Sequence, residues 1–125
     1  MTEPAEFFDL YRQGFARVAV AVPRCRVADP AFNAEQSIVL LQQAASQGAA
    51  LVAFPELGLS AYTCDDLFHQ RSLLDGCEAA LARIVEASAC LSAVAVVGLP
   101  LRVDHSLLNC AAVVQRGRVL GIVPK

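Results

Sequence analysis

Short runs of apolar residues mark three strands in the sequence. They are ARVAVAV at 16–22, ALVAF at 50–54 and VAVVGLP at 94–100. The last two show no alternation of apolar and polar positions, which is typical of strands covered on both faces. We expect the first strand to end at Pro23 and the third at Pro100, because proline has no N–H to donate to a sheet.

Apolar residues between these strands recur at helical spacing. Asp29 is suited to cap a helix that begins at Pro30, and Gly48 is placed to end it. A second, longer helix is predicted over about 70–92. Each helix has an apolar stripe with offsets of three and four residues: Ala34, Ile38, Leu41 and Ala45 in the first, and Leu73, Cys77, Ala80, Ile84, Ala87 and Leu91 in the second.

The two ends of the chain complete the predicted order of elements. Residues 3–12 can form a short amphipathic helix that ends before Gly14. Near the other end, SLLNCAAVVQ and RVLGIV flank Arg116-Gly117, which predicts a tight hairpin turn. Helices and strands that first alternate and then give way to neighbouring strands predict an α/β sandwich with a mixed sheet. At 125 residues, we expect positions 1–125 to belong to one domain.

The composition narrows the class of protein. Hydrophobic residues make up 56% of the chain and the mean hydropathy is +0.49, which excludes a disordered protein. So much apolar surface in a short chain indicates either a sheet covered on both faces or a surface that something else covers. The net charge is −2 and basic residues are scattered, which argues against nucleic acid as a partner. An acidic amino terminus and the lack of a membrane-length apolar run predict a cytoplasmic protein.

Five cysteines offer no metal site. They stand at positions 25, 64, 77, 90 and 110, without a C-x-x-C pair, and the chain has two histidines. We expect most of them to be reduced, buried thiols. A gap of five residues between Cys64 and His69 fixes no geometry for a thiol–imidazole pair. Asp65 and Asp66 are predicted to form a solvated turn or a helix start, and no metal is expected.

The candidate catalytic residues follow the ends of predicted strands. Glu56 follows Pro55 after one strand, and Lys125 follows Pro124 after another. Ligands of α/β sheets bind beyond the carboxyl ends of the strands, so the two charged groups are candidate partners at one edge. The alternative is that both are ordinary solvated charges that end strands. Tyr62 also has two interpretations: it lines a small pocket, or it covers the hydrophobic core.

The motifs FPELGLSAY at 54–62 and VPK at 123–125 resemble two of the three motif regions of the nitrilase, or carbon-nitrogen hydrolase, superfamily. The resemblance covers nearly the whole chain. More narrowly, SAYTCDDLF and EFFDLYRQGF are similar to the amino-terminal glutaminase domain in the actinobacterial family of glutamine-dependent NAD synthetases. This resemblance implies roughly the first half of an α-β-β-α sandwich.

The resemblance also implies an activity, the hydrolysis of glutamine to glutamate and ammonia by a Glu-Lys-Cys triad. Glu56 matches the general base and Lys125 the catalytic lysine, and Tyr62 matches a tyrosine that lines the glutamine pocket. The family's nucleophilic cysteine lies after the lysine, and no cysteine of this chain matches it. We therefore expect the 125 residues alone to be inactive. Burial should raise the pKa of Glu56, whereas the charge of Lys125 should oppose that shift.

Partners follow from the same resemblance. No cofactor is expected for the glutaminase step, whose ammonia would pass to an ATP-dependent synthetase domain; ATP and Mg are expected only there. A homo-oligomer is also implied. Two other functions remain open: a nitrilase-type amidohydrolase acting on another small amide, and a non-catalytic fragment or interaction module.

Overall fold

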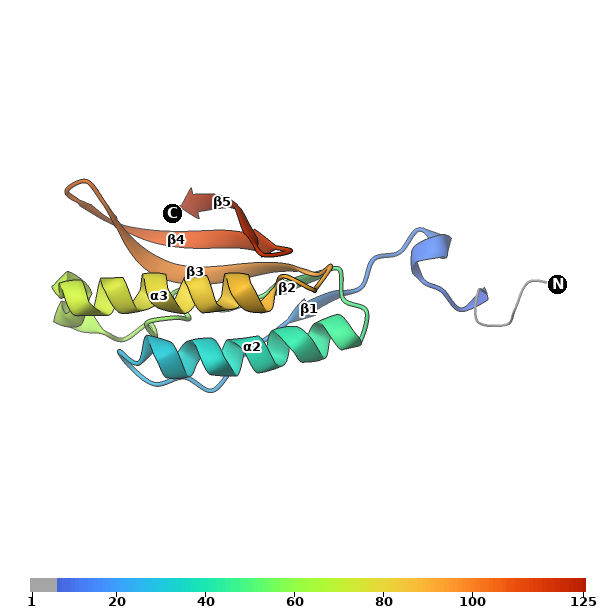
Figure 1. Ribbon diagram of the computed structural model, residues 1–125, viewed down its shortest axis with the longest axis horizontal. Helices are drawn as coiled ribbons and strands as arrows, with labels where there is room; N and C mark the ends of the chain where they lie inside the picture. The colour runs from blue at the N-terminus through green and yellow to red at the C-terminus, as the bar shows by residue number, and fades with distance from the viewer. Residues whose placement is uncertain (1–6) are drawn as a thin grey trace.

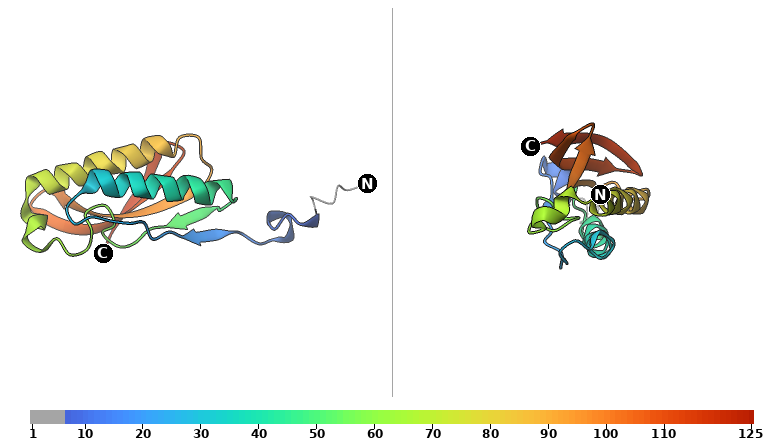
Figure 2. Two further views of the ribbon diagram at one scale, coloured as in Figure 1. Left: turned by 90° about the horizontal axis from the view of Figure 1, so that it is seen from below. Right: turned by 90° about the vertical axis from the view of Figure 1, so that its left-hand side faces the viewer.

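The computed structural model describes residues 7–125, which form one five-stranded sheet with two long helices on one face (Figures 1 and 2). The strand order is β1-β2-β3-β4-β5. The first three strands are parallel, and the β3–β4 and β4–β5 pairs are antiparallel. The strands are β1 (Val18–Val20), β2 (Leu51–Ala53), β3 (Val94–Val103), β4 (Ser106–Gln115) and β5 (Arg118–Pro124). The predicted α/β class and mixed sheet are confirmed.

The first long helix, α2 (Pro30–Ser46), has the predicted boundaries. The Asp29 carboxylate accepts a hydrogen bond from the N–H of Phe32 at 3.1 Å, which satisfies one of the free donors of the first turn. Gly48 has a φ of +79°, a left-handed conformation that glycine adopts without strain and that ends helices.

The second long helix, α3 (Arg71–Ala87), ends earlier than its apolar stripe predicts. Ser88 caps it: the hydroxyl donates to the carbonyl of Val85 at 2.7 Å and accepts from the N–H of Gly117 at 2.9 Å. The helix therefore ends where the Ser88 side chain binds the main chain of the β4–β5 turn. Between the two long helices lies a 3₁₀ helix, η2 (Asp65–His69), which begins at the two aspartates as predicted.

The prediction that Pro100 ends its strand is wrong. β3 continues to Val103, and Pro100 is paired with Asn109 of β4. The reason is the length of β2, which pairs only with Val94–Val96 of β3. At Pro100, β3 has a strand neighbour on the β4 side alone, and proline is tolerated at such an edge because its missing N–H breaks no ladder bond.

Two hairpins build the antiparallel half of the sheet. Arg116 and Gly117 both have positive φ, at 48° and 74°, as a two-residue turn of the twisted hairpin type requires. The β3–β4 hairpin, with Asp104 at a φ of 54°, was not evident in the sequence. At the other end, residues 3–6 of the helix predicted over 3–12 lie outside the described part of the chain. Further along, the described residues include the 3₁₀ helix η1 (Tyr11–Gln13) before Gly14.

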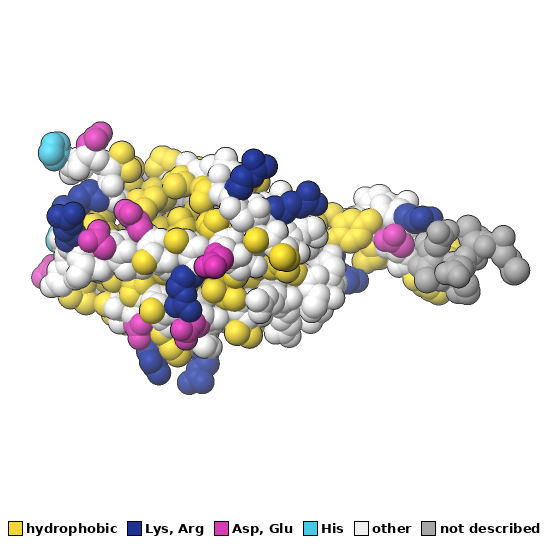
Figure 3. All heavy atoms as spheres, in the orientation of Figure 1, with side chains coloured by type: hydrophobic (Ala, Val, Ile, Leu, Met, Phe, Trp, Pro, Cys, Tyr) yellow, Lys and Arg dark blue, Asp and Glu magenta, His cyan; other side chains and the backbone are white. Residues whose placement is uncertain are grey.

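The core lies between the sheet and the two helices. Its fully buried side chains are Leu41, Leu59, Ile84, Leu99, Val52, Val97 and Val114, among others. The other face of the sheet is open over much of its area: Val18 is 66% exposed, Val20 is 82% exposed, and every residue of β5 is exposed. It is covered at Gly98 and Pro100 of β3, which are buried. Figure 3 shows the side of the molecule that carries the helices, where apolar side chains are also visible above α3, over the antiparallel strands. Within residues 7–125, coverage on both faces is therefore found for part of β3 and not for β1 or β5.

Within the described residues, no helix combines the length and apolarity needed to cross a membrane.

Candidate functional site

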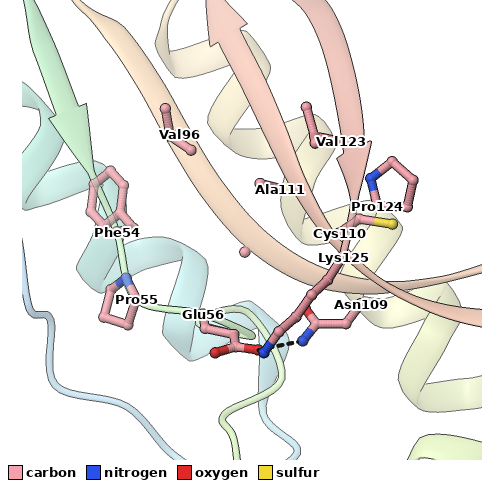
Figure 4. Close-up of a pocket in the computed structure, with 11 residues that line it drawn as sticks. Phe54, Pro55, Glu56, Val96, Asn109, Cys110, Ala111, Val123, Pro124 and Lys125 are labelled. Carbon is pink, nitrogen blue, oxygen red and sulfur yellow. Dashed lines mark hydrogen bonds and ion pairs between the residues drawn. The ribbon is translucent and has the colours of Figure 1, made fainter.

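Glu56 and Lys125 meet at one edge of the sheet. The chain reverses direction twice between β3 and β5, so β5 runs parallel to β2 and both strands end at the same edge. Glu56 follows β2 by a short turn, and Lys125 follows β5 directly. Glu56 Oε1 lies 2.7 Å from Lys125 Nζ, an ion pair with hydrogen-bond geometry (Figure 4). The structure thus joins the two charged residues that the sequence placed at strand ends.

Asn109 of β4 contacts both partners. Its side-chain Nδ2 donates to Glu56 Oε1 at 2.5 Å, and its main-chain carbonyl accepts from the N–H of Lys125 at 2.8 Å. Sequence analysis did not select this residue. The one available signal was an amide within the otherwise apolar run LLNCAAVV, where a polar side chain needs a partner.

A pocket of about 280 Å³ opens beside the ion pair. Figure 4 shows its lining, which comes from the end of β2 and from the three antiparallel strands. Apart from Glu56, Asn109 and Lys125, the lining is apolar or thiol: Phe54, Pro55, Val96, Gly98, Cys110, Ala111, Val123 and Pro124. Such a pocket, with a few convergent polar groups at its edge, is typical of small-molecule sites.

The ion pair sets the protonation of both groups. The Glu56 side chain is 42% exposed, and the hydrogen bond from Lys125, then that from Asn109, holds the pKa of Glu56 below its usual value. The same hydrogen bond raises the pKa of Lys125. Burial raises the pKa of Glu56 and Lys125 opposes that shift, as expected, and the two hydrogen-bond donors outweigh the desolvation, so the net shift is downward. At neutral pH the carboxylate and the ammonium are both charged.

Gly98 of β3 makes room for the turn that carries Glu56. A Cβ at Gly98 would lie 2.5 Å from the nitrogen of Leu57 and 2.6 Å from the carbonyl oxygen of Pro55. Main-chain atoms cannot yield as a flexible side chain can. Only a residue without a side chain lets the turn lie directly against β3, and the N–H of Leu59 then donates to the carbonyl of Gly98 at 3.1 Å.

The turn is also held from the helix side by Asn33 of α2, which is fully buried. Its amide donates to the carbonyl of Leu59 at 3.0 Å and to that of Arg26 at 2.9 Å, and its oxygen accepts from the N–H of Arg26. Leu57 and Ala61 adopt left-handed backbone conformations with φ of 53° and 67°. Non-glycine residues hold such conformations where surrounding contacts fix them, and functional sites are common places for this.

Replacing Asn33 by alanine is expected to lower the free energy of unfolding by about 2–3 kcal/mol. The substitution leaves the main-chain groups of Arg26 and Leu59 without their partner, and a buried unsatisfied polar group costs about 1–3 kcal/mol. Urea denaturation followed by circular dichroism measures the change. Gln42→Ala, an exposed glutamine on the same helix, is the matched control and should change stability by less than about 0.5 kcal/mol.

Tyr62 does not line the pocket in this structure. Its side chain is 64% exposed, although it lies close enough to Lys125 to contribute to the raised pKa of that lysine. Tyr62 therefore does not cover the core.

Of the five cysteines, Cys110 alone lines the pocket beside the ion pair. Cys64, Cys77 and Cys110 are buried. Burial raises the pKa of the Cys110 thiol, and raises that of Cys77 to about 12. The Cys64 thiol donates to the carbonyl of Ser60 at 3.0 Å. Within residues 7–125, no group of acidic, histidine and cysteine side chains is placed to bind a metal.

Comparisons with known proteins point to one family of proteins. A sequence model of the carbon-nitrogen hydrolase family matches residues 17–124. The glutamine-dependent NAD(+) synthetase of Mycobacterium tuberculosis is 46% identical over 119 residues, which is 95% of this chain and 18% of that protein. The synthetase of Xylella fastidiosa is 41% identical over 106 residues, 84% of this chain and 19% of that protein. The chain thus spans about a fifth of the length of these relatives.

Solved structures show the same fold. A glutamine-dependent NAD(+) synthetase from Cytophaga hutchinsonii superimposes with a TM-score of 0.77 at 26% identity, over 88% of this chain and 19% of that one. A nitrilase-superfamily amidase from Nesterenkonia gives a TM-score of 0.75 over 88% of this chain and 42% of that one. At 24% identity, the amidase supports the fold alone.

Proposed function

Since this chain belongs to the carbon-nitrogen hydrolase family, we propose that Glu56 and Lys125 serve the hydrolysis of an amide, and that the amide is the side chain of glutamine. The observation that carries the proposal is the 2.7 Å ion pair beside an open pocket at the carboxyl ends of the strands. Similarity to glutamine-dependent NAD(+) synthetases over 95% of the chain supports glutamine as the substrate.

Glu56 would act as the general base. A thiol is a weak nucleophile until it loses its proton, and a carboxylate within hydrogen-bond reach can accept that proton. The lowered pKa of Glu56 keeps the carboxylate unprotonated and ready to do so at neutral pH. The thiolate would then attack the amide carbon, and the proton would leave with ammonia. Water activated by Glu56 would hydrolyse the thioester to glutamate.

Lys125 would stabilise the negative charge that develops on the amide oxygen. Its ammonium is fixed at the edge of the pocket by Glu56 and its main chain by Asn109, so the charge is in place before the reaction begins. Removal of one such donor costs about 3–4 kcal/mol of transition-state stabilisation in well-studied hydrolases.

The nucleophile in this proposal is a cysteine outside these 125 residues. Cys110 is the one cysteine that lines the pocket, and the raised pKa of its thiol keeps it protonated. Cys25 and Cys90 are exposed and line no part of the pocket. Tyr62, which is exposed and does not line the pocket within these 125 residues, would contribute to the glutamine site in the longer polypeptide.

The ammonia would be consumed by an ATP-dependent synthetase domain joined to this one. The relatives are named for glutamine-dependent NAD(+) synthesis, which requires such a partner for the glutaminase. ATP and Mg would belong to that domain, and the glutaminase step would need no cofactor. A homo-oligomer located in the cytoplasm completes the proposal.

Release of glutamate and ammonia from glutamine tests the function. A polypeptide that continues beyond Lys125 to the length of the relatives should hydrolyse glutamine, whereas the 125-residue chain should show negligible turnover. Small aliphatic amides serve as the comparison substrates. Hydrolysis of those amides without hydrolysis of glutamine would refute the substrate assignment, and glutamine turnover by the 125-residue chain would refute the assignment of the nucleophile.

A further inference from the structure

The two oxygens of the Glu56 carboxylate have different surroundings. Lys125 Nζ and Asn109 Nδ2 both donate to Oε1, at 2.7 and 2.5 Å. Among the described residues, none donates a hydrogen bond to Oε2. In Figure 4, Lys125 and Asn109 approach the carboxylate together. One oxygen is thus fully engaged by the protein, and the other is left to accept a proton.

Asn109 is the residue that makes this arrangement specific. An ion pair alone lets a carboxylate rotate and exchange its oxygens, because an ammonium is a point charge on a flexible stem. A second donor from a strand, aimed at the same oxygen, fixes the plane of the carboxylate. Since Asn109 also holds the N–H of Lys125 through its carbonyl, one residue of β4 sets the positions of both charged groups.

We propose that Asn109 is a positioning residue for the hydrolysis. It holds Glu56 Oε1 so that Oε2 faces the reacting thiol and water, and it anchors Lys125 in register with that carboxylate. This inference rests on the proposed function, because a general base must be present for its orientation to matter. Asparagine suits the position because its amide supplies a donor, whereas aspartate of the same shape would place a second carboxylate against Glu56.

Glutamine hydrolysis by Asn109 variants in the extended polypeptide provides the first test. Asn109→Ala and Asn109→Asp should lower kcat about 10–100-fold, with KM changed less than about threefold, since the hydrogen bond to a charged group is lost. Gln115→Ala is the matched control: this amide lies on the same strand and donates to the carbonyl of Ser92. Its kcat should stay within about twofold of the parent.

The pH profile separates positioning from a general loss of structure. Without the Asn109 donor the pKa of Glu56 rises, so the acidic limb of kcat/KM should move to higher pH, and further with Asn109→Asp. The groups that face or adjoin the carboxylate are Lys125 from β5, the Cys110 thiol from β4 and, beside Lys125, Tyr62. The raised pKa values of Lys125 and Cys110 keep both protonated over this range. A fall in kcat with an unmoved acidic limb would overturn the proposal.

A titration of the parent 125-residue chain tests the contact without any activity. The side-chain NH₂ resonances of Asn109 should shift with the same midpoint as the Glu56 carboxyl carbon. Flat Asn109 resonances would overturn the proposal even if glutamine is hydrolysed. Coupled resonances together with a protein that does not hydrolyse glutamine would support the contact and refute the proposed function. This arm needs no variant, so it decides the matter if Asn109→Ala does not fold.

Discussion

Glu56→Gln is expected to lower kcat for glutamine hydrolysis by about 10²–10⁴-fold, the usual contribution of a general base. Glutamine has the shape of glutamate but cannot accept the proton of a thiol. Lys125→Ala should cost about 10²–10³-fold, because the developing oxyanion loses its charged donor. Both variants should keep the synthesis of NAD from free ammonia in the extended polypeptide, since that reaction bypasses the glutaminase. Coupled assays of glutamate release and NAD formation measure both quantities.

A control with the same chemistry lies on the helix layer. Glu35 of α2 accepts a hydrogen bond from Arg83 of α3 at 3.2 Å, on an exposed surface. Glu35→Gln should leave glutamine hydrolysis within about twofold, because it removes a carboxylate from an ion pair outside the pocket. Retention of glutamine-dependent activity by Glu56→Gln, with this control unchanged, would contradict the assignment of Glu56 as the base.

Gly98→Ala is expected to separate Glu56 from Lys125. The added Cβ meets main-chain atoms of Pro55 and Leu57 within 2.6 Å, so the turn between them must move away from β3. Misplacing a catalytic group by about 1 Å can cost about 10²-fold in rate, and the forced shift should lower the free energy of unfolding by about 1–3 kcal/mol. Glutamine hydrolysis and urea denaturation measure the two effects.

Gly121→Ala is the matched control on the same sheet. A Cβ at Gly121 of β5 meets no atom within 4 Å, and its φ lies outside the left-handed region. Alanine there should be neutral or slightly stabilising, since strand interiors favour residues other than glycine. Equal effects of the two substitutions would show that the turn tolerates a side chain at Gly98, against the close approach described above.

The sequence predicted the parts of this fold that depend on local chemistry. Asp29 and Pro30 begin α2 because a cap and a fixed φ act within one turn. Arg116 and Gly117 form the β4–β5 turn because two residues with positive φ suffice to reverse a strand. The resemblance of two motifs placed Glu56 and Lys125 as a pair, and the sheet topology explains how they meet.

Other features could not be predicted because they depend on residues distant in sequence. Pro100 is tolerated within β3 only because β2 is short. Gly98 carries no local signal, since the atoms that require it belong to the turn after β2. The lowered pKa of Glu56 likewise depends first on Lys125 and then on Asn109, which lie 69 and 53 positions further along the chain. Periodicity shows which face of an element is buried, but not which backbone will lie against it.

Glu56 and Lys125 lie 69 positions apart in the sequence, which bears on the order of folding. The β3–β4 and β4–β5 hairpins pair strands that are neighbours in sequence. The β1–β2 and β2–β3 pairs join strands that are separated by the helices α2 and α3, so these pairs form only after a helical crossover has closed. Because contacts between distant segments form late, we expect the ion pair to close only when these two halves of the sheet join. A folding intermediate with both hairpins formed would have β3, β4 and β5 paired, but it would lack the ion pair between Glu56 and Lys125 and therefore the proposed catalytic site.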